Sequence, residues 1–478
     1  MSVSFGFNNP EFSDRVLYIV RKGKTHSLSS DNNDDDEPQS KKSKLLNVLS
    51  EDESCIKQIH VNTMWLAAQS SMFLTMYSIE MAENQQKYLK IVVANEQEAN
   101  IFVLCLKLIY GFEIPSDPQL LFDILLMANQ YQFTHSIPTI CSKLCDCKIE
   151  LEMAYKILHM PDSIKFEHEK TDEFGELLDK VAGIIAKHFS PIEKFMQASE
   201  FLELSSTSVV ACLESPLLKV GSENSVYVAA KLWLTQNEKT ADTDCIEKLF
   251  KCIRLSYCSQ LFLVEQVAND SFFVDMYQKK LTNVEQPTST NHASSPACSS
   301  YYAVEKHNNS FSILFEKTIK EAFSFHCKAI KNTTPSFRCL PAEECKKINC
   351  IGLTIPAVRD MPQIIESSVF YLCGYPFILE ASKCHRDGEI VFSLFLFSKA
   401  VLAQTNFKVI RKFDVYDHTK SEWVCLNETT SSYTKSPTGM GMYNLFRKPF
   451  ETAFANGSPY VNPEDGSLKL RAQLEMIF

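Results

Sequence analysis

Several features that usually mark an enzyme or a membrane protein are missing from the 478-residue sequence. No run of about 18 apolar residues occurs, so we expect no membrane-spanning helix. The 13 glycines form no Gly-x-x-x-x-Gly-Lys phosphate loop. There is neither a Gly-x-Ser-x-Gly elbow nor a His-Glu-x-x-His motif. These absences argue against a P-loop NTPase, an α/β-type serine hydrolase and a zinc peptidase of the usual kind.

An excess of positive charge is also missing. Asp and Glu number 58 against 48 Lys and Arg, and the formal net charge is −10. Because binding to phosphate backbones or anionic membranes needs a basic surface, we expect neither direct nucleic-acid binding nor membrane binding. The first residues contain no basic segment followed by an apolar stretch, so no secretory signal is expected.

Cysteine is plentiful, with 17 residues, but its spacing is not that of a metal site. The tightest group is Cys141, Cys145 and Cys147, whereas structural zinc usually needs Cys-x2-Cys pairs in matched sets. The remaining cysteines stand singly among aliphatic residues, as buried free thiols do in a reducing compartment. We therefore predict no metal, no cofactor and a location in the cytoplasm and/or nucleus.

The length is too great for one hydrophobic core, and the periodicity changes along the chain. Up to residue 148, strand patterns such as Val16–Val20 and Tyr88–Val93 alternate with helical ones such as Ala99–Tyr110, which indicates an α/β module. Trp65–Tyr77 also has helical spacing. Residues 24–54 are rich in acidic and Lys residues and poor in apolar ones, which predicts a disordered insertion.

Residues 149–281 show helical periodicity almost throughout, with Ser222 as a candidate N-cap of one helix. Residues 282–312 are rich in Ser, Thr, Asn and Pro and read as a linker. From 313 to 478 the period becomes two, which predicts an antiparallel β-sandwich. Apolar residues alternate with polar ones from Leu468 to Met476, and similarly from Phe407 to Val415 with Arg411 as the exception.

Some short phrases of the first 148 residues resemble the BTB (POZ) family, a dimerising module that recruits other proteins. They are Ser13-Asp14, Leu66-Ala67-Ala68, Ser70, Phe73, Met76-Tyr77, Met81 and Glu83. The helical block resembles the BACK domain, and the last segment is similar to the TRAF-like (MATH) family. Gly441–Phe446 and Leu468–Glu475 most resemble the plant light-response BTB-BACK cullin-3 adaptors.

The resemblance implies a multidomain chain of α/β, all-α and all-β parts. Its domains would be a BTB/POZ domain (1–148), a BACK helical bundle (149–281), a linker (282–312) and a TRAF-like β-sandwich (313–478). The implied function is a non-catalytic, homodimeric adaptor that brings an unknown protein substrate to a cullin-3 RING E3 ubiquitin ligase for proteasomal degradation. The alternatives are a nuclear cofactor, favoured by a possible import patch at Lys41–Lys44, and a structural tether.

The resemblance also implies where cullin-3 would bind. The family contact is an apolar residue followed two positions later by Glu, which here is Met81 and Glu83. Tyr77 and Tyr110 would border the same patch. An apolar side chain that fills a pocket of the partner often dominates the energy of an interface. The open alternative is that Met81 packs inside its own domain and that Glu83 is a solvated charge.

For the dimer interface, the resemblance indicates the N-terminal segment, with Phe5, Phe7, Phe12 and Asp14 as candidates. The phenylalanines could instead cover their own domain. Many BTB domains pair the Asp with a basic residue before Leu-Ala-Ala, but this chain has Asn62 and Thr63 there. We therefore expect Asp14 to accept hydrogen bonds from neighbouring groups or to stay partly solvated.

The substrate-binding residues are the least constrained. The sequence does not identify a pocket, and Tyr371, Tyr375 and Trp423 are guesses among the aromatic residues of the C-terminal part. Packing in the core of the β-rich region is the competing interpretation for each of them.

Overall fold

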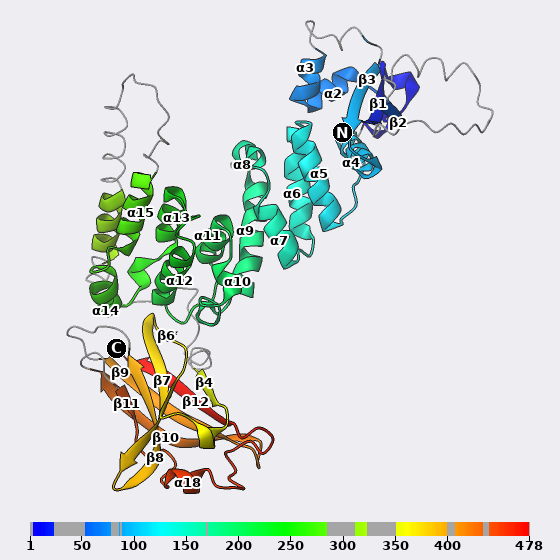
Figure 1. Ribbon diagram of the computed structural model, residues 1–478. Helices are drawn as coiled ribbons and strands as arrows, with labels where there is room; N and C mark the ends of the chain where they lie inside the picture. The colour runs from blue at the N-terminus through cyan, green and yellow to red at the C-terminus, as the bar shows by residue number, and fades with distance from the viewer. Residues whose placement is uncertain are drawn as a thin grey trace, which may run out of the picture. The chain divides into compact units, whose positions relative to one another are not determined.

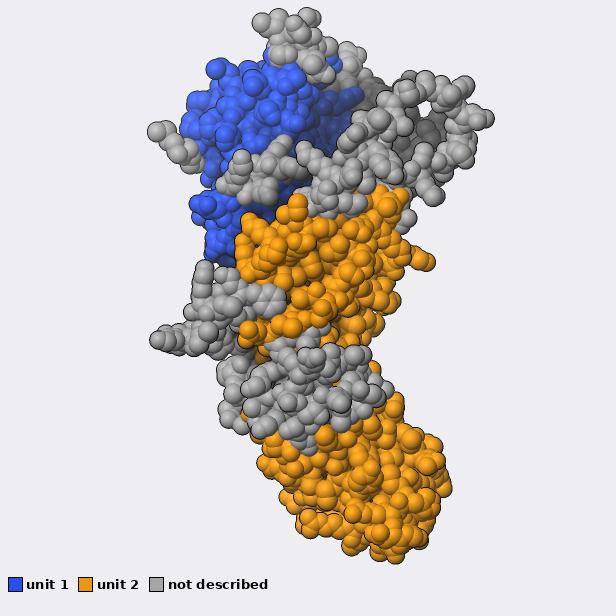
Figure 2. Space-filling view, turned by 90° about the vertical axis from the view of Figure 1, so that its left-hand side faces the viewer, with its two compact units in different colours: residues 1–184 blue, residues 185–478 orange. Residues whose placement is uncertain are grey.

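The computed structural model describes residues 3–22, 53–77, 86, 88–168, 171–283, 311–322, 350–398, 407–433 and 439–477. The chain divides into two compact units, residues 1–184 and 185–478 (Figure 2). Most of the expected insertion and most of the expected linker lie outside the described residues, as does Lys41–Lys44. No helix of the described ranges has the length and apolar content needed to cross a bilayer.

The first unit begins with a mixed three-stranded sheet in the order β2-β1-β3. The strands are β1 (Arg15–Lys22), β2 (Glu53–Val61) and β3 (Tyr88–Val93). β1 pairs antiparallel with β2 and parallel with β3. The expected strands at Val16–Val20 and Tyr88–Val93 are confirmed. β2 starts at Glu53, so it includes the last two residues of the expected insertion.

Helices make up the rest of this unit. They are η1 (Ser4–Gly6), η2 (Pro10–Phe12), α2 (Thr63–Gln69), α3 (Ser71–Met76), α4 (Glu96–Ile109), α5 (Pro118–Gln130), η4 (Thr134–Ser136), α6 (Ile137–Asp146), α7 (Leu151–Leu158), α8 (Asp162–His168) and α9 (Asp172–His188), which continues into the second unit. α4 ends where predicted, because Gly111 adopts a φ of 87° that favours glycine.

The helix predicted over Trp65–Tyr77 is two helices, and Ser70 is the reason. Ser70 is extended, with φ −145°, and its hydroxyl accepts a hydrogen bond from the N–H of Phe73 to cap α3. The same hydroxyl donates to the carbonyl of Tyr131 at 2.6 Å. Ser70 therefore ends α2 and caps α3. Its hydrogen bond to Tyr131 fixes this break against the end of α5.

The second unit opens with a helical block. Its helices are η5 (Ile192–Lys194), α10 (Ser199–Leu202), α11 (Ser206–Glu214), α12 (Glu223–Gln236), α13 (Thr243–Cys252), η6 (Leu255–Tyr257), α14 (Gln260–Phe262), η7 (Leu263–Val267) and α15 (Phe272–Asn283). Ser222 caps α12 as predicted, accepting a hydrogen bond from the N–H of Asn224 at 3.2 Å. Trp233 is 1% exposed, and its indole N–H donates to the carbonyl of Leu204 at 3.0 Å.

A further helix, residues 311–322, overturns the expected start of the β-rich region at 313. Its buried aromatic side chains pack on the helical block. The ring of Phe311 stacks on Tyr277 with centroids 4.3 Å apart, and Phe315 lies 5.0 Å from Phe250. Phe311 and Phe315 are four residues apart, which is helical rather than strand spacing. The β-rich part of the described chain begins at Cys350.

Two antiparallel sheets follow (Figure 1). One has the order β10-β9-β12-β4, and the other has the order β11-β8-β7-β5 with β6 also paired to β7. The strands are β4 (Cys350–Ile355), β5 (Ile364–Glu366), β6 (Phe370–Leu372), β7 (Tyr375–Arg386), β8 (Glu389–Ser398), β9 (Phe407–Asp417), β10 (Glu422–Tyr433), β11 (Gly439–Met442) and β12 (Leu468–Ile477); two short helices, η8 (Val358–Asp360) and α18 (Phe450–Ala453), lie in the connections.

The alternation predicted for the last strand is confirmed. Leu468, Leu470, Ala472 and Leu474 are all at most 2% exposed. The exception predicted at Arg411 also has its explanation. This side chain is 6% exposed on the buried face of β9, and its Nη2 donates to the carbonyl of Gly441 in β11 at 3.1 Å. Arg411 therefore joins the two sheets through their shared interior.

Candidate partner-binding sites

The start of α2 uses neutral donors, as expected from Asn62 and Thr63 at positions where many BTB domains have a basic residue. Asn62 caps the helix, its side-chain oxygen accepting from the N–H of Trp65 at 3.0 Å. Asp14 is exposed, and one of its oxygens accepts from the N–H of Thr63 at 2.8 Å. Its other oxygen accepts from the Thr63 hydroxyl. The expectation for Asp14 is confirmed: it takes hydrogen bonds from neighbours and remains in contact with solvent.

Tyr77 lies directly after α3 and is held from two sides. Its ring stacks on Phe73 with centroids 6.2 Å apart, and the guanidinium of Arg15 lies 4.9 Å from the ring centroid. Its hydroxyl is buried and has no hydrogen-bond partner within the described part of the chain. Burial raises the pKa of Tyr77 well above its usual range. The side chain of Tyr77 is therefore held in place by Phe73 and Arg15 and is only partly buried.

Leu74 precedes Tyr77 by three residues and is 58% exposed. Residues three apart on a helix share a face, so Leu74 extends the surface around Tyr77. The sequence reasoning missed Leu74, although its spacing from Tyr77 is a usable signal. Met81 and Glu83 lie outside the described residues, so the structure does not place the two central members of the predicted cullin contact.

Tyr110 lies inside the unit rather than at its surface. It is 2% exposed, and its hydroxyl accepts a hydrogen bond from the backbone N–H of Asn62 at 3.2 Å. Its ring contacts Phe7 and Trp65, with centroid separations of 5.5 and 6.3 Å. Burial raises its pKa. Tyr110 thus offers no free surface to a partner and acts by supporting the residues around the start of α2.

The N-terminal phenylalanines divide into two kinds. Phe7 packs on Tyr110 and Phe112 of its own unit, which is the alternative left open for it. Phe5 and Phe12 contact each other edge to face at 5.1 Å and are 63% and 51% exposed. They form an apolar surface that nothing in the described part of this unit covers.

Met64 is a further exposed apolar side chain of this unit and was missed by the sequence reasoning. It is 82% exposed at the first turn of α2. The side-chain amide of Asn62 donates to the carbonyl of Phe12 at 3.3 Å, which places η2 beside the start of that helix. The sequence around Met64 does not reveal its exposure. Met64 faces solvent because Leu66 is the residue of α2 that is buried in the core.

Of the three aromatic residues suggested for substrate binding, Tyr375 is the clearest correction. It is fully buried, and its ring contacts Phe262 of the helical block at 5.8 Å. The neighbouring turn is tied to the same block, because the amide of Asn224 donates to the carbonyl of Cys373 at 2.8 Å. Tyr375 therefore packs the β-rich region against helices and cannot touch a substrate in this arrangement.

The other two suggested residues differ in access. Tyr371 is half-buried on the short strand β6, and burial raises its pKa. Trp423 is 36% exposed on β10, with the guanidinium of Arg471 4.4 Å from its ring centroid and Tyr416 at 5.4 Å. Trp423 remains accessible and is held by a cation and a second aromatic ring.

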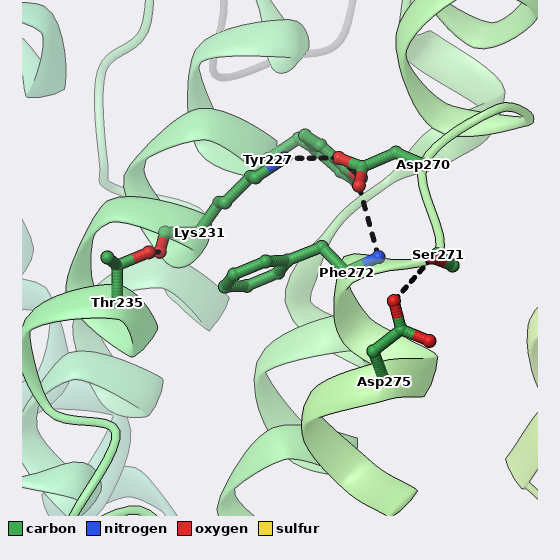
Figure 3. A network of polar contacts seen from close by, with 7 residues as sticks. All are labelled: Tyr227, Lys231, Thr235, Asp270, Ser271, Phe272 and Asp275. Atoms are coloured by element: carbon green, nitrogen blue, oxygen red, sulfur yellow. Dashed lines mark hydrogen bonds and ion pairs between the residues drawn. The ribbon is translucent and has the colours of Figure 1, made fainter. Parts of the chain in front are cut away.

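A network of polar contacts lies in the helical block around Asp270 (Figure 3). Asp270 accepts hydrogen bonds from the Tyr227 hydroxyl at 2.9 Å, from Lys231, and from the N–H of Phe272 at 3.0 Å. The ammonium of Lys231 also lies 4.9 Å from the ring centroid of Phe272. The network ties α12 to the start of α15 and so helps to hold the helical block together.

A metal site is equally unsupported by the described ranges. They contain no group of three or more His, Cys, Asp or Glu side chains that could hold an ion. Cys141, Cys145 and Cys147 are free thiols, and burial raises the pKa of Cys141 to about 12. A thiol with a raised pKa is a poor ligand and a poor nucleophile.

Two family models match the chain. The BTB/POZ domain model matches residues 39–148, and the BACK model (BTB And C-terminal Kelch) matches residues 170–268. Neither match reaches β1 or the two C-terminal sheets. The matched ranges cover the first unit from β2 to α6 and the helices from α9 to η7.

Similar proteins come from plants and animals. BTB/POZ domain-containing protein At2g46260 of Arabidopsis thaliana is 24% identical over 430 residues, covering 88% of this chain and 72% of its own. BTB/POZ domain-containing protein At4g01160 of the same plant is 22% identical over 88% of this chain and 77% of its own. Kelch-like protein 40b of Danio rerio is 26% identical over 215 residues, 44% of this chain and 32% of its own.

Proposed function

Because the chain carries a BTB domain followed by a BACK domain, we propose that it is the substrate-recognition adaptor of a cullin-3 RING E3 ubiquitin ligase. That domain pair fits cullin-3 adaptors in general, and such proteins are typically non-catalytic. The adaptor would dimerise and bind cullin-3 through its first unit. It would bind its substrate through the two C-terminal sheets, which we propose form a TRAF-like β-sandwich over residues 350–478.

The observation that carries the proposal is the order of the parts. A recruiting module is followed by a helical spacer and then by a separate β-rich region with an accessible aromatic surface at Trp423. In such a ligase the chemistry belongs to a ubiquitin-charged enzyme brought in by the RING protein. The adaptor accelerates transfer by proximity alone, since it holds a substrate lysine near the thioester.

For the cullin contact we propose the surface that runs from α3 into the segment after it, with Leu74, Tyr77, Met81 and Glu83. Leu74 is exposed, and Tyr77 is fixed against Phe73 by stacking. An exposed apolar side chain beside a fixed aromatic ring is suited to fill an apolar groove on the partner protein. Glu83 would supply the acceptor for hydrogen bonds at the edge.

For the dimer we propose the apolar surface of Phe5, Phe12 and Met64. Burying three such side chains is worth roughly 1.5–3 kcal/mol each, before the cost of association. Asp14 lies close to the start of α2, and its two oxygens already accept hydrogen bonds from Thr63, which lowers the cost of covering the carboxylate. Two chains would present two β-rich regions, and this avidity would strengthen capture of a substrate.

The test is recovery of cullin-3 with the full-length chain from cells. We expect wild type to retain cullin-3, and Met81→Ala combined with Glu83→Lys to lose it, because removing an anchor side chain costs about 2 kcal/mol or more. Leu74→Glu should lose it as well. Leu217→Glu is the matched control, since Leu217 is 41% exposed in the helical block.

Recovery of no cullin-3 with wild type would reject the ligase role. A chain that still dimerised would then act as a tether, or as a nuclear cofactor if Lys41–Lys44 directed import. Equal loss with Leu217→Glu would show that an added charge, and not the α3 surface, disturbs the complex.

A further inference from the structure

A cavity lies in the β-rich region, and none of the three residues first suggested for substrate binding lines it. Its volume is about 600 Å³, within the range of ligand sites. Three connections line it: the one after β4, the turn between β9 and β10, and the segment before β12. Its polar lining is Arg359, Asp360, His418, Thr419, Asn456, Ser458, Asn462 and Asp465.

These three connections are fixed to one another. The backbone N–H of His418 donates to the carbonyl of Pro459 at 2.7 Å, and that of Val358 donates to Gly466 at 3.0 Å. The guanidinium of Arg359 donates through Nε to the carbonyl of Phe454 at 2.7 Å. The cavity is therefore preorganised, and a ligand would not need to order its walls.

Strain and an unused polar atom mark the same place. Ala357, in the cavity wall, has a φ of 46°, a conformation that an alanine rarely adopts and that costs free energy. The Nε2 atom of His418 is buried and has no hydrogen-bond partner among the residues that the structure describes. A buried ring nitrogen without a partner is costly, and a ligand in the cavity could supply one.

An aromatic row continues from the cavity onto the outer face of the sheet. The ring of His418 contacts Tyr416 at 5.0 Å, and Tyr416 contacts Trp423 at 5.4 Å. Two cations border this row. The ammonium of Lys469 lies 5.8 Å from the centroid of Tyr416, and Arg471 lies over Trp423. Cavity and row together form one continuous surface.

Several carboxylates on this surface are already engaged. Asp414, 1% exposed, accepts from Arg471 and Gln473. Asp417 accepts from the backbone and hydroxyl of Thr419. Asp465 accepts from the N–H of Ser467, which lowers its pKa. The ammonium of Lys469 also contributes to this lowered pKa, and it is exposed beside the aromatic rings, where it can attract an outside carboxylate.

We propose that the cavity and the aromatic row bind an extended acidic peptide segment of the substrate. The backbone of this segment would enter the cavity and meet His418, and its Asp or Glu side chains would lie along the row near Lys469. Asp360 is an exposed carboxylate of the cavity wall, so it would direct the acidic side chains away from itself. This inference rests on the proposed role as substrate receptor and names the substrate class.

The experiment measures binding of two labelled, terminally blocked peptides to the full-length chain by fluorescence anisotropy. Oligoglutamate should bind, and oligoglutamine should bind at least about tenfold more weakly, since the loss of paired charges is worth about 1.4 kcal/mol or more. Lys469→Glu should weaken oligoglutamate at least about fivefold, because it reverses an exposed charge beside the row. Trp423→Ala should weaken oligoglutamate as well.

Lys448→Glu is the matched control. Lys448 is an exposed lysine of the same region, next to Pro449, which bridges to β8 in the other sheet. Equal binding of the two peptides, no binding of oligoglutamate, or equal weakening by Lys448→Glu and Lys469→Glu would each overturn the inference. Because no cullin is present in this assay and Lys469→Glu should still recover cullin-3, failure here is distinct from failure of the ligase role.

Discussion

The exposed surfaces of the first unit and of the β-rich region differ in kind. Phe5, Phe12 and Met64 expose apolar side chains, and the carboxylate of Asp14 accepts its hydrogen bonds from the neutral Thr63. On the β-rich region the exposed ring of Trp423 lies under the guanidinium of Arg471, and its neighbour Tyr416 contacts His418 of a polar cavity. An apolar surface suits a lasting contact between copies, and a charged aromatic one suits selection among clients.

Two aspartates make this difference measurable. Asp14 is exposed and bonded to a threonine, whereas Asp414 is 1% exposed and bonded to Arg471 and Gln473. Removing the carboxylate of Asp14 leaves only the neutral donors of Thr63 without a partner, and they lie near solvent. Loss of the second leaves a guanidinium without its charge partner on a largely buried sheet, so the same substitution should have very different costs.

The largest effect is expected from Asp414→Ala. Breaking a buried ion pair from one side costs roughly 3–5 kcal/mol, and the partial exposure of Arg471 places this case at about 3 kcal/mol. Chemical denaturation would measure the free energy of unfolding of the β-rich region. The double variant Asp414→Leu with Arg471→Met should recover most of the loss, and a loss under about 1 kcal/mol for the single variant would refute this role.

The next effect concerns self-association. Phe5→Glu combined with Phe12→Glu should weaken the dimer by about 2–3 kcal/mol, at least about thirtyfold in Kd, because two exposed rings would no longer be buried between chains. Sedimentation of the full-length chain over a range of concentrations would measure this. Leu217→Glu should leave the dimer unchanged. A dimer that ignored the double substitution would place the interface elsewhere.

A smaller effect is expected from Asp14→Ala. It removes two hydrogen bonds at an exposed helix start, and Asn62 still caps α2, so the cost should be about 1 kcal/mol. A double-mutant cycle with Thr63→Val isolates the pair, with an expected coupling energy of about 0.5–1 kcal/mol. A cost as large as that of Asp414→Ala would remove the contrast drawn between the two regions.

The smallest expected effect is a difference in salt dependence between peptide binding and dimerisation. Raising the ionic strength screens exposed charges, so binding of an acidic peptide near Lys469 should weaken several-fold. The dimer contact through Phe5 and Phe12 should be unchanged or slightly strengthened. Parallel anisotropy and sedimentation titrations would show this, and equal salt dependence would contradict the assignment of apolar and charged roles.

Local signals explain what the sequence predicted well. The alternation in β12, the cap at Ser222 and the helix end at Gly111 each depend on neighbouring residues only, and each is confirmed. The turn between β7 and β8 is equally local, since Asp387 and Gly388 both have the positive φ that a two-residue hairpin uses. Such features could be read without knowing what packs against them.

Contacts between distant segments explain what it predicted poorly. Helix 311–322 exists because Phe311 and Phe315 pack on Tyr277 and Phe250, far earlier in the chain. Tyr375 was a candidate for substrate binding, but its buried ring packs on Phe262 of the helical block. The cavity is built by three connections that are separate in sequence, and no single one of them carries a motif. Tertiary packing, not local propensity, decides these positions.

The most direct test of the account is calorimetric titration of the purified full-length chain with the N-terminal region of cullin-3. The account predicts saturable binding with one cullin for each chain, weakened at least about thirtyfold by Met81→Ala with Glu83→Lys and unaffected by Lys469→Glu. Absence of binding by wild type at micromolar concentrations, or equal affinity of wild type and the Met81/Glu83 double variant, would contradict it.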